Sequence, residues 1–463
     1  MCKKSGLHLH IAMYPLFAMG HITPFLDLAN KLAKAGHTIS IFLPTKTRLK
    51  LTPHNHYANL ITFIPISIPP VDGLPCGAET THDIPASARP KLLHAMDLTR
   101  DIIDSQLSNL KPDIVLFDTL DWLPGLARKH GVKSVYYAVQ TPAMFGYCSI
   151  NARNLISDHH LVESDLTNPP PGFPTPEIRL RGHESRAIVR IFMGEVGNGL
   201  KFLQKHNIAI EQSDAILFKS CREMEGIYCD FVEKNFYNKP VFLAGPVVPK
   251  TPTTKLDEFF NNWLNNFSHG SVVYCALGSE CVLQIDQFNE LVLGLELTGK
   301  PFLAVLKPPV GYEKLETVLP EGFLERTKNR GIVYDGWVQQ LLILKHLSVG
   351  CFVTHCGPGS LSEGLISECQ LVLMPQAVDQ FVNARVMSLE LRVGVEVEKR
   401  GEEDGFVSRE AVQKAVSVVM DDGSEVGKEV RENHAKWRNF LFQEHLEESY
   451  VSLFVQNLKD LIG

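Results

Sequence analysis

Short apolar runs alternate with amphipathic stretches along the whole sequence. Runs such as HTISIFLP, KPDIVLFD and VGCFVTH are rich in β-branched residues, which is typical of buried strands. Pro24–Ala35 (PFLDLANKLAKA) has apolar residues at helical spacing and stops at Gly36, a common helix end. Strands that alternate with helices in this way indicate parallel sheets.

The same periodicity predicts further helices and loops. We expect a loop over PLFAMGHITP, which would place His21 in the turn between the first strand and the first helix. Proline and glycine predict two more loops, over residues 66–90 and 168–176. The remaining helices are expected at residues 87–110, 191–206, 224–236, 285–297 and 429–462.

The clearest change in composition is the segment Val241–Lys255 (VFLAGPVVPKTPTTK), where a strand gives way to a Pro/Thr-rich stretch. After it the strand–helix alternation begins again with SVVYCALGS. We therefore predict an α/β fold of two Rossmann-like domains whose parallel sheets face a cleft. The expected bounds are 1–245 for the first domain, 246–256 for the linker and 257–440 for the second domain.

Composition narrows the function classes. At 463 residues the chain is long enough for two or three domains, and its net charge of −7 argues against a nucleic-acid partner. The ten cysteines follow no extracellular framework, so we expect reduced thiols in the cytoplasm. We find no signal peptide and no apolar run long enough to span a membrane. We expect a monomer.

The stretch Trp337–Gln380 has the local pattern of a phosphate site. VGCFVTH is a strand, CGPGS is a glycine turn and LSEGLISE has helical spacing. Glycines let the backbone approach an anion, and the first N–H groups of a helix point at it. His355 and Ser360 flank the turn as further donors, and Glu363 could reach a ribose.

This stretch resembles the nucleotide-sugar motif of plant UDP-dependent glycosyltransferases: an opening Trp, Gln three residues later, HCG, Ser, Glu and a closing Asp-Gln. The resemblance continues in YPLFAMGHITPFLDLANKLAKAGH, FDTLDW and GPVV. It implies the GT-B fold, with the end of the chain (441–463) packing back on the first domain. It also implies a UDP-sugar as donor substrate, with no other cofactor.

The family's donor-binding roles fall on matching positions of this sequence. Trp337 and Gln340 would hold the uracil, Glu363 the ribose, and Asp379 with Gln380 the sugar, glucose being more usual with a closing Gln. The full set expected to contact the donor is Gly20, Thr141, Ser279, Trp337, Val338, Gln340, His355, Gly357, Gly359, Ser360, Glu363, Asp379 and Gln380.

Several of these residues also have a purely structural interpretation. Trp337 and His355 could be packed core residues, and the turn at Gly278-Ser279 could be an ordinary one. Ser360, Thr141 and the Asp379-Gln380 pair could cap helices.

His21 is the candidate catalytic base. Sugar transfer requires a hydroxyl that loses its proton as it attacks, and a neutral imidazole suits that step near pH 7. A carboxylate behind the ring would fix its tautomer and stabilise the imidazolium. Asp118, at the end of IVLFD, is the candidate, and the resemblance implies the same pair; Asp121 is a less favoured competitor. No Asp-x-Asp triplet occurs, so we predict no metal site and no metal requirement.

Two departures from the family motif point to one of its branches. HCGPGS replaces the usual HCGWNS, which puts Pro358 and Gly359 in place of an aromatic residue and an Asn. Gly359, with the opening WVQQ, is typical of members that add a sugar to an existing sugar. The favoured function is inverting transfer, to the 2″-hydroxyl of a flavonoid or anthocyanidin 3-O-glucoside. Alternatives within the class are rhamnosyl or xylosyl transfer to a terpenoid or phenylethanoid glycoside, or transfer to a free aglycone.

Two other classes of protein share parts of this pattern. A nicotinamide dehydrogenase would need G-x-G-x-x-G after its first strand, and PLFAMGHITP lacks it. A two-domain sugar-binding protein would share the architecture, but it would be expected to carry a secretion signal and no base at the cleft.

Overall fold

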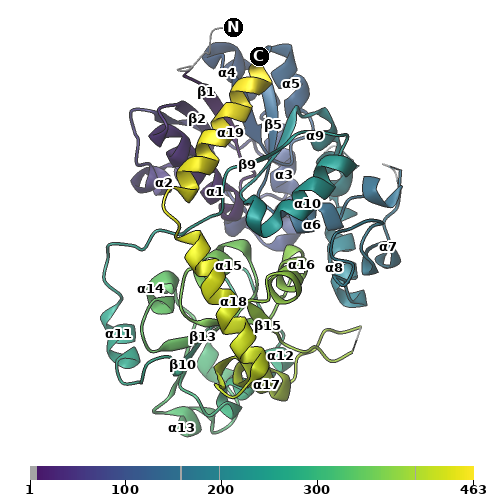
Figure 1. Ribbon diagram of the computed structural model, residues 1–463. Helices are drawn as coiled ribbons and strands as arrows, with labels where there is room; N and C mark the ends of the chain where they lie inside the picture. Colours follow the sequence, from purple (N-terminus) through teal and green to yellow (C-terminus); the bar gives the residue numbers. More distant parts are fainter. Residues whose placement is uncertain (1–7, 157–158, 198, 402) are drawn as a thin grey trace.

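The computed structural model describes residues 8–156, 159–197, 199–401 and 403–463. They form two parallel sheets, one in each lobe of the molecule (Figure 1). The first has seven strands in the order β3 (Ile61–Ile66), β2 (Thr38–Pro44), β1 (His10–Tyr14), β4 (Ile114–Phe117), β5 (Lys133–Ala138), β8 (Ala215–Phe218) and β9 (Val241–Leu243). The second has six: β12 (Gly331–Tyr334), β11 (Phe302–Val305), β10 (Val272–Ala276), β13 (Val349–Thr354), β14 (Gln370–Leu373) and β15 (Gly394–Glu396).

Helices connect the strands of each sheet. Those of the first half are α1 (Met19–Lys34), α2 (Thr45–Leu51), α3 (Arg89–Asp97), α4 (Arg100–Leu110), α5 (Leu123–Lys129), α6 (Pro142–Tyr147), α7 (Glu163–Thr167), α8 (Gly182–Phe192), α9 (Phe202–Gln212) and α10 (Arg222–Asn235). Those of the second half are α11 (Glu258–Leu264), α12 (Ile285–Leu297), α13 (Phe323–Thr327), α14 (Gln340–Leu344), α15 (Pro358–Leu365), α16 (Asp379–Arg385), α17 (Arg409–Met420) and α18 (Glu425–Leu441).

The expectation of two parallel α/β sheets is confirmed. We propose that the domain boundary lies at 246–256, because β9 is the last strand of the first sheet and β10 the first strand of the second. The two halves also share apolar packing. One buried cluster combines Tyr147 and Phe231 of the first half with Phe381 and Val386 of the second.

The last helix, α19 (Leu446–Ile462), crosses back and lies along the first sheet's lobe (Figure 1). Val451, Phe454, Val455 and Leu458 are buried in the core that includes β1, β2 and α1. The Tyr450 hydroxyl accepts from the Arg222 N–H at 2.8 Å and donates to Glu223 at 2.7 Å. The chain therefore passes between the two halves twice.

Two helix predictions were wrong near glycines and prolines. α1 begins at Met19, so His21 lies in its first turn and not in a loop. Pro24 suggested a loop because it has no N–H for the Gly20 carbonyl, but Ile22 and Phe25 are buried and hold the turn in place. The expected helix over 191–206 is interrupted by the antiparallel pair β6 (Glu195–Val196) and β7 (Leu200–Lys201).

Two long predicted helices are each divided. The stretch 87–110 forms α3 and α4, with a break between Asp97 and Arg100. The stretch 429–462 forms α18 and α19, and His445 between them has a φ of 66°, outside the right-handed helical region. Amphipathic periodicity alone continues across such breaks, so it predicted one helix in each case.

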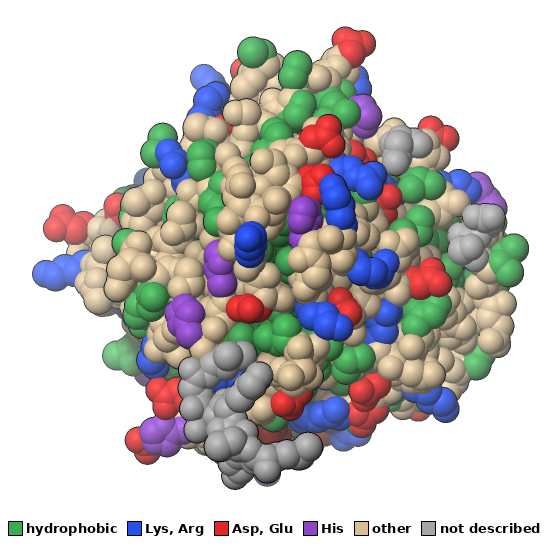
Figure 2. Space-filling view, turned by 90° about the horizontal axis from the view of Figure 1, so that it is seen from above, with side chains coloured by type: hydrophobic (Ala, Val, Ile, Leu, Met, Phe, Trp, Pro, Cys, Tyr) green, Lys and Arg blue, Asp and Glu red, His purple; other side chains and the backbone are tan. Residues whose placement is uncertain are grey.

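Charge is mixed over the surface. Figure 2 shows Lys and Arg side chains interspersed with Asp and Glu over the face that carries the first sheet's lobe.

No helix in the described part of the chain is long and apolar enough to cross a membrane.

Candidate active site

Each sheet has one place where the strand order reverses. In the first sheet this lies between β1 and β4, and in the second between β10 and β13. Ligands of open α/β sheets bind outside the carboxyl ends of the strands at such a point. His21 and Asp118 follow β1 and β4, while Ser279 and His355 follow β10 and β13. The sequence-predicted residues therefore lie at both of these places.

His21 and Asp118 form a hydrogen-bonded pair. His21 Nδ1 lies 2.7 Å from Asp118 Oδ2, and the other carboxylate oxygen accepts the Leu16 N–H at 2.6 Å. The Asp118 side chain is 2% exposed and that of His21 is 25% exposed. A carboxylate at Nδ1 places the proton there and leaves Nε2 as an acceptor. The pair thus has the geometry of an oriented general base.

Asp121, the competing carboxylate, is engaged elsewhere. Its Oδ1 lies 3.1 Å from the Nζ of Lys205, a buried lysine that also pairs with Asp97. A carboxylate held by a buried ammonium is a structural element, and no contact joins it to His21 in the described residues.

Strained backbone lies beside three of the candidate residues. Thr119, Cys356 and Val378 have positive φ angles of 59°, 65° and 40°. They adjoin Asp118, His355 and Asp379 in turn. Positive φ is unfavourable for β-branched residues such as Thr and Val, and it persists only where the surrounding structure enforces it. Such strain gathers at functional turns.

His355 is enclosed by glycine backbone at the second sheet's reversal. A Cβ added at Gly278 or Gly357 would lie 2.7 or 2.5 Å from His355 Nε2, so only glycine leaves room for the ring there. Burial lowers the pKa of His355 to about 4, so the ring is neutral at pH 7. The Ala276 backbone hydrogen-bonds to the ring and raises this pKa by a smaller amount. The neutral ring can still donate a hydrogen bond to a ligand placed against the glycine turn.

The turn after His355 opens directly into a helix. α15 begins at Pro358, three residues earlier than the expected helical spacing, with Gly357 as its N-cap. Ser360 is therefore the third helical residue and not the cap. Proline at the first position costs no hydrogen bond, since its missing N–H would be free anyway. The N–H groups of Gly359 and Ser360 point out of the helix start, and a Cβ at Gly359 would meet nothing within 4 Å.

Gln340, Glu363 and Ser360 form one polar network. The Gln340 amide nitrogen donates to Glu363 Oε2 at 2.6 Å and to Ser360 Oγ at 3.2 Å. Its carbonyl oxygen accepts from the Tyr274 hydroxyl at 3.2 Å. Burial raises the pKa of Glu363, and the Gln340 hydrogen bond lowers it again. The network ties the segment after β12 to the helix of the phosphate turn.

Trp337 and Val338 lie at the edge of this network. The Trp337 side chain is 83% exposed, so the packing alternative is wrong and one ring face is open to a flat ligand. The Val338 carbonyl accepts the Gln340 N–H at 3.0 Å.

Asp379 and Gln380 begin α16 at the boundary between the halves. Gln380 Oε1 accepts the N–H groups of Gln376 and Ala377, both at 2.9 Å, and so braces the loop before the helix. Asp379 is half-buried, and desolvation raises the pKa of its carboxyl group; Lys219, Asn383 and His21 act in the opposite direction. His21 of the first half is thus within electrostatic reach of Asp379 of the second.

Thr141 joins the two halves. Its hydroxyl contacts the Asn383 carbonyl oxygen at 3.0 Å and also accepts the Met144 N–H at 3.2 Å. The helix-capping interpretation therefore holds, together with a contact to α16. Gly20 lies one residue before His21, with open space where a Cβ would be.

Two residues at this site were missed from the sequence. Lys219 follows β8 and faces Asp379, and burial lowers the pKa of its ammonium to about 8. Asn383 donates to the Cys356 carbonyl at 3.2 Å and so connects α16 with the phosphate turn. The position of Lys219 after a buried strand was the available signal. Among the described residues, no group of three or more His, Cys, Asp or Glu could hold a metal ion.

Comparison with known proteins agrees with this geometry. Residues 228–430 match the model of the UDP-glucoronosyl and UDP-glucosyl transferase family. The chain is 53% identical to a cyanidin 3-O-galactoside 2″-O-xylosyltransferase of Actinidia chinensis var. chinensis, over 98% of this chain and 99% of that protein. It is 49% identical to an anthocyanidin 3-O-glucoside 2″-O-glucosyltransferase of Ipomoea nil, over 98% of each.

A solved structure shows the same fold. Glycyrrhiza uralensis UGT73P12, complexed with glycyrrhetinic acid 3-O-monoglucuronide, aligns with a TM-score of 0.80 at 22% identity, over 98% of this chain and 96% of that one. The expected GT-B architecture is thereby confirmed.

Proposed function

We propose, from the premise that this chain belongs to the family of UDP-glucoronosyl and UDP-glucosyl transferases, that it adds a sugar to the 2″-hydroxyl of an anthocyanidin or flavonoid 3-O-glycoside. The observation that carries the chemistry is the His21–Asp118 pair facing Asp379 across the boundary between the two halves. The relatives from Actinidia and Ipomoea are named for the same acceptor hydroxyl, which supports that position.

The reaction divides between the two halves. His355, with the free N–H groups of Gly359 and Ser360, would hold the diphosphate of the donor and stabilise the charge that develops on the leaving UDP. Trp337 and Gln340 would bind the uracil, Glu363 the ribose, and Asp379 with Gln380 the sugar hydroxyls. The neutral ring of His355 and the helix-start N–H groups would supply the charge stabilisation that a metal ion provides in other transferases.

His21 would carry out the proton transfer. As the acceptor oxygen forms its bond to the anomeric carbon, the bond from that carbon to the diphosphate oxygen breaks. The acceptor proton moves to His21 Nε2, and Asp118 stabilises the resulting imidazolium. Attack from the face opposite to the leaving UDP inverts the anomeric configuration.

The donor sugar is the finer part of the proposal. The two relatives are named for xylose and for glucose. Gln380 favours glucose here, with xylose and rhamnose as alternatives. Terpenoid glycosides, phenylethanoid glycosides and free aglycones are the alternative acceptors.

A matrix of donors and acceptors tests this function. UDP-glucose, UDP-xylose and UDP-rhamnose are each incubated, with EDTA present, with cyanidin 3-O-glucoside, cyanidin 3-O-galactoside, quercetin 3-O-glucoside and free cyanidin. Products are identified by mass spectrometry and the linkage by NMR. We expect a 2″-linked disaccharide from one donor, and no product when the 2″-hydroxyl of the acceptor is methylated. Equal transfer to the methylated acceptor would refute the linkage, and no turnover with any pair would refute the function.

A further inference from the structure

A cavity of about 470 Å³ lies between the two halves, away from the phosphate turn. The first half contributes residues 167–168, 177 and 179–182 to its lining, and the second contributes residues 385, 388–389 and 396. Arg385 ends the helix that Asp379 begins, so the cavity is about 9 Å along that helix from the candidate sugar site. Residues of both halves line it, and none of them belongs to the phosphate turn.

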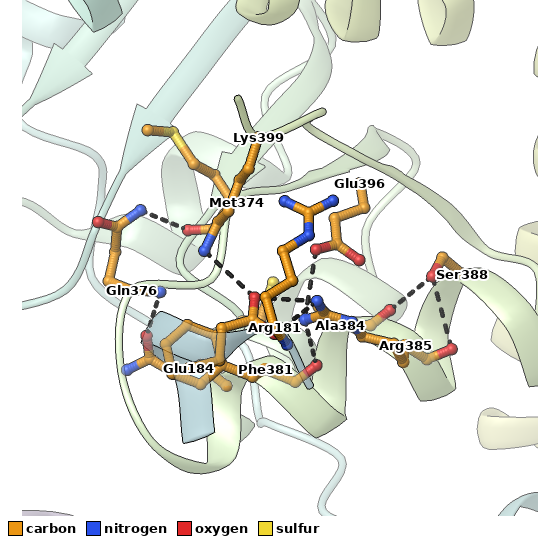
Figure 3. Close-up of polar contacts among 12 residues, drawn as sticks. Arg181, Glu184, Met374, Gln376, Phe381, Ala384, Arg385, Ser388, Glu396 and Lys399 are labelled. Atoms are coloured by element: carbon orange, nitrogen blue, oxygen red, sulfur yellow. Dashed lines mark hydrogen bonds and ion pairs between the residues drawn. The ribbon is translucent and has the colours of Figure 1, made fainter. Parts of the chain in front are cut away.

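Arg385 is fully paired at the floor of this cavity. Its Nη2 donates to both carboxylate oxygens of Glu184, at 2.9 and 2.8 Å, and its Nη1 lies 3.3 Å from Glu396 (Figure 3). Lys399 adds a contact of 3.5 Å to Glu184. Glu184 is buried and belongs to α8 of the first half, so the ion pair crosses the boundary between the halves.

Two further arginines line the cavity, and their side chains make no hydrogen bond or close ion pair with the described residues. Neither Arg179 nor Arg181 donates a side-chain hydrogen bond or forms an ion pair with any residue that the structure describes. The Nη1 atom of Arg181 is buried and unsatisfied. In Figure 3 the Arg181 guanidinium lies next to Glu396 without a dashed contact. A buried guanidinium nitrogen without an acceptor is costly, which favours an acceptor supplied by a ligand.

The charge balance indicates the sign of that ligand. The charged residues lining the cavity, within the described ranges, are three arginines (179, 181 and 385) and two glutamates (177 and 396), an excess of one positive charge. Behind these lining residues, the positive charge of Lys399 and the negative charge of Glu184 cancel. Glu396 is shared between Arg385, 3.3 Å away, and Arg181, whose positive charge counteracts the rise in the Glu396 pKa that burial causes.

We propose that this cavity binds a small oxyanion, a phosphate or a dicarboxylate, between Arg179 and Arg181. The planar fork of a guanidinium matches two oxygens of either group. Bound there, the anion contacts the first half directly and lies against the second half through the Arg385–Glu396 wall. It therefore joins the halves at a point remote from the donor site.

Isothermal titration calorimetry of the full chain tests this site with two probes, inorganic phosphate and malonate. Saturating UDP is present, to occupy the diphosphate turn, and NaCl is held near physiological ionic strength to screen diffuse binding. The test variant is the double change Arg179→Gln and Arg181→Gln. The control is Arg100→Gln, which removes an exposed arginine at the start of α4, outside the cavity.

We expect saturable one-to-one binding of at least one probe to the wild type and to Arg100→Gln. In the double variant the affinity should fall about tenfold or more, since each charge-assisted hydrogen bond contributes about that factor. The probe with the larger affinity identifies the class of anion. If the double variant does not fold, Arg179→Gln alone, which alters an exposed side chain, should still weaken binding. Binding that is absent in the wild type, or undiminished in the folded variants, would overturn the proposal.

Discussion

Replacing Asp118 by Asn should almost abolish transfer without disturbing the fold. Asp118 Oδ1 accepts the Leu16 N–H at 2.6 Å, and an asparagine can keep that bond only through its carbonyl oxygen. Its NH₂ group must then face His21 Nδ1, where Oδ2 now lies at 2.7 Å. Because that group donates, Nδ1 becomes the acceptor and the ring proton moves to Nε2. His21 then presents a proton to the acceptor hydroxyl and cannot take one.

The size of the effect follows from the lost base. General-base catalysis contributes about 10²–10⁴-fold in rate, which corresponds to about 3–5 kcal/mol of transition-state stabilisation. We expect kcat to fall by this factor while KM for both substrates changes little. His21→Ala combined with Asp118→Asn should be no slower than His21→Ala alone, because the two residues act as one unit.

Initial rates of UDP release, measured with saturating donor and acceptor, provide the assay. Asp113→Asn is the matched control: Asp113 precedes β4 as Asp118 follows it, and it also accepts a backbone N–H, from His10 at 2.8 Å. The control should retain wild-type kcat. An Asp118→Asn enzyme within about threefold of wild type, or a double variant slower than His21→Ala by the full single-variant factor, would refute the tautomer argument.

Three other predictions concern the donor site and stability. In Gly359→Asn the new side chain meets open space and adds a hydrogen-bond donor near the diphosphate. The KM for the UDP-sugar should therefore fall several-fold, with unchanged thermal stability. An increase in KM would contradict the open space at this position. Lys219 lowers the pKa of Asp379, so in Lys219→Met that pKa rises and the acid limb of the kcat/KM profile should move to higher pH; an unmoved limb would exclude this coupling. Burial lowers the pKa of His434 to about 4 from 6.5, so its neutral form stabilises the fold fully above pH 6.5. That contribution, about 3 kcal/mol, is lost as pH falls from 6.5 to 4, and urea denaturation of His434→Gln should show a correspondingly shallower loss over this window.

Hydrophobic periodicity predicted the strands and helices whose own sequence determines their secondary structure. The strand Val349–Thr354 and the helix Ile285–Leu297 have strong periodicity, and the structure has both at the expected places. Each end residue of a parallel strand could also be located, because a strand exit is visible as the end of an apolar run. That is why Asp118 and His355, which directly follow buried strands, could be predicted from the sequence.

Contacts between distant segments could not be found in this way. Glu184 and Arg385 are 201 residues apart, and nothing in their neighbourhoods marks them as partners. Lys219 resembles any lysine after a strand until the boundary between the halves brings Asp379 opposite it. The start of α1 was misplaced for a related reason: Pro24 is a local signal against helix, and burial of Phe25 in tertiary packing outweighs it.

The return of α19 to the first sheet's lobe has a consequence for synthesis on the ribosome. Phe454 and Leu458 complete a core that includes residues of β1, β2 and α1, which are made more than 400 positions earlier. During translation this apolar surface of the first lobe stays exposed until the second lobe and α19 have been synthesised. The nascent chain therefore exposes a binding surface for chaperones during this time. A stop codon just before residue 446 would leave both lobes translated, with the core of the first lobe incomplete.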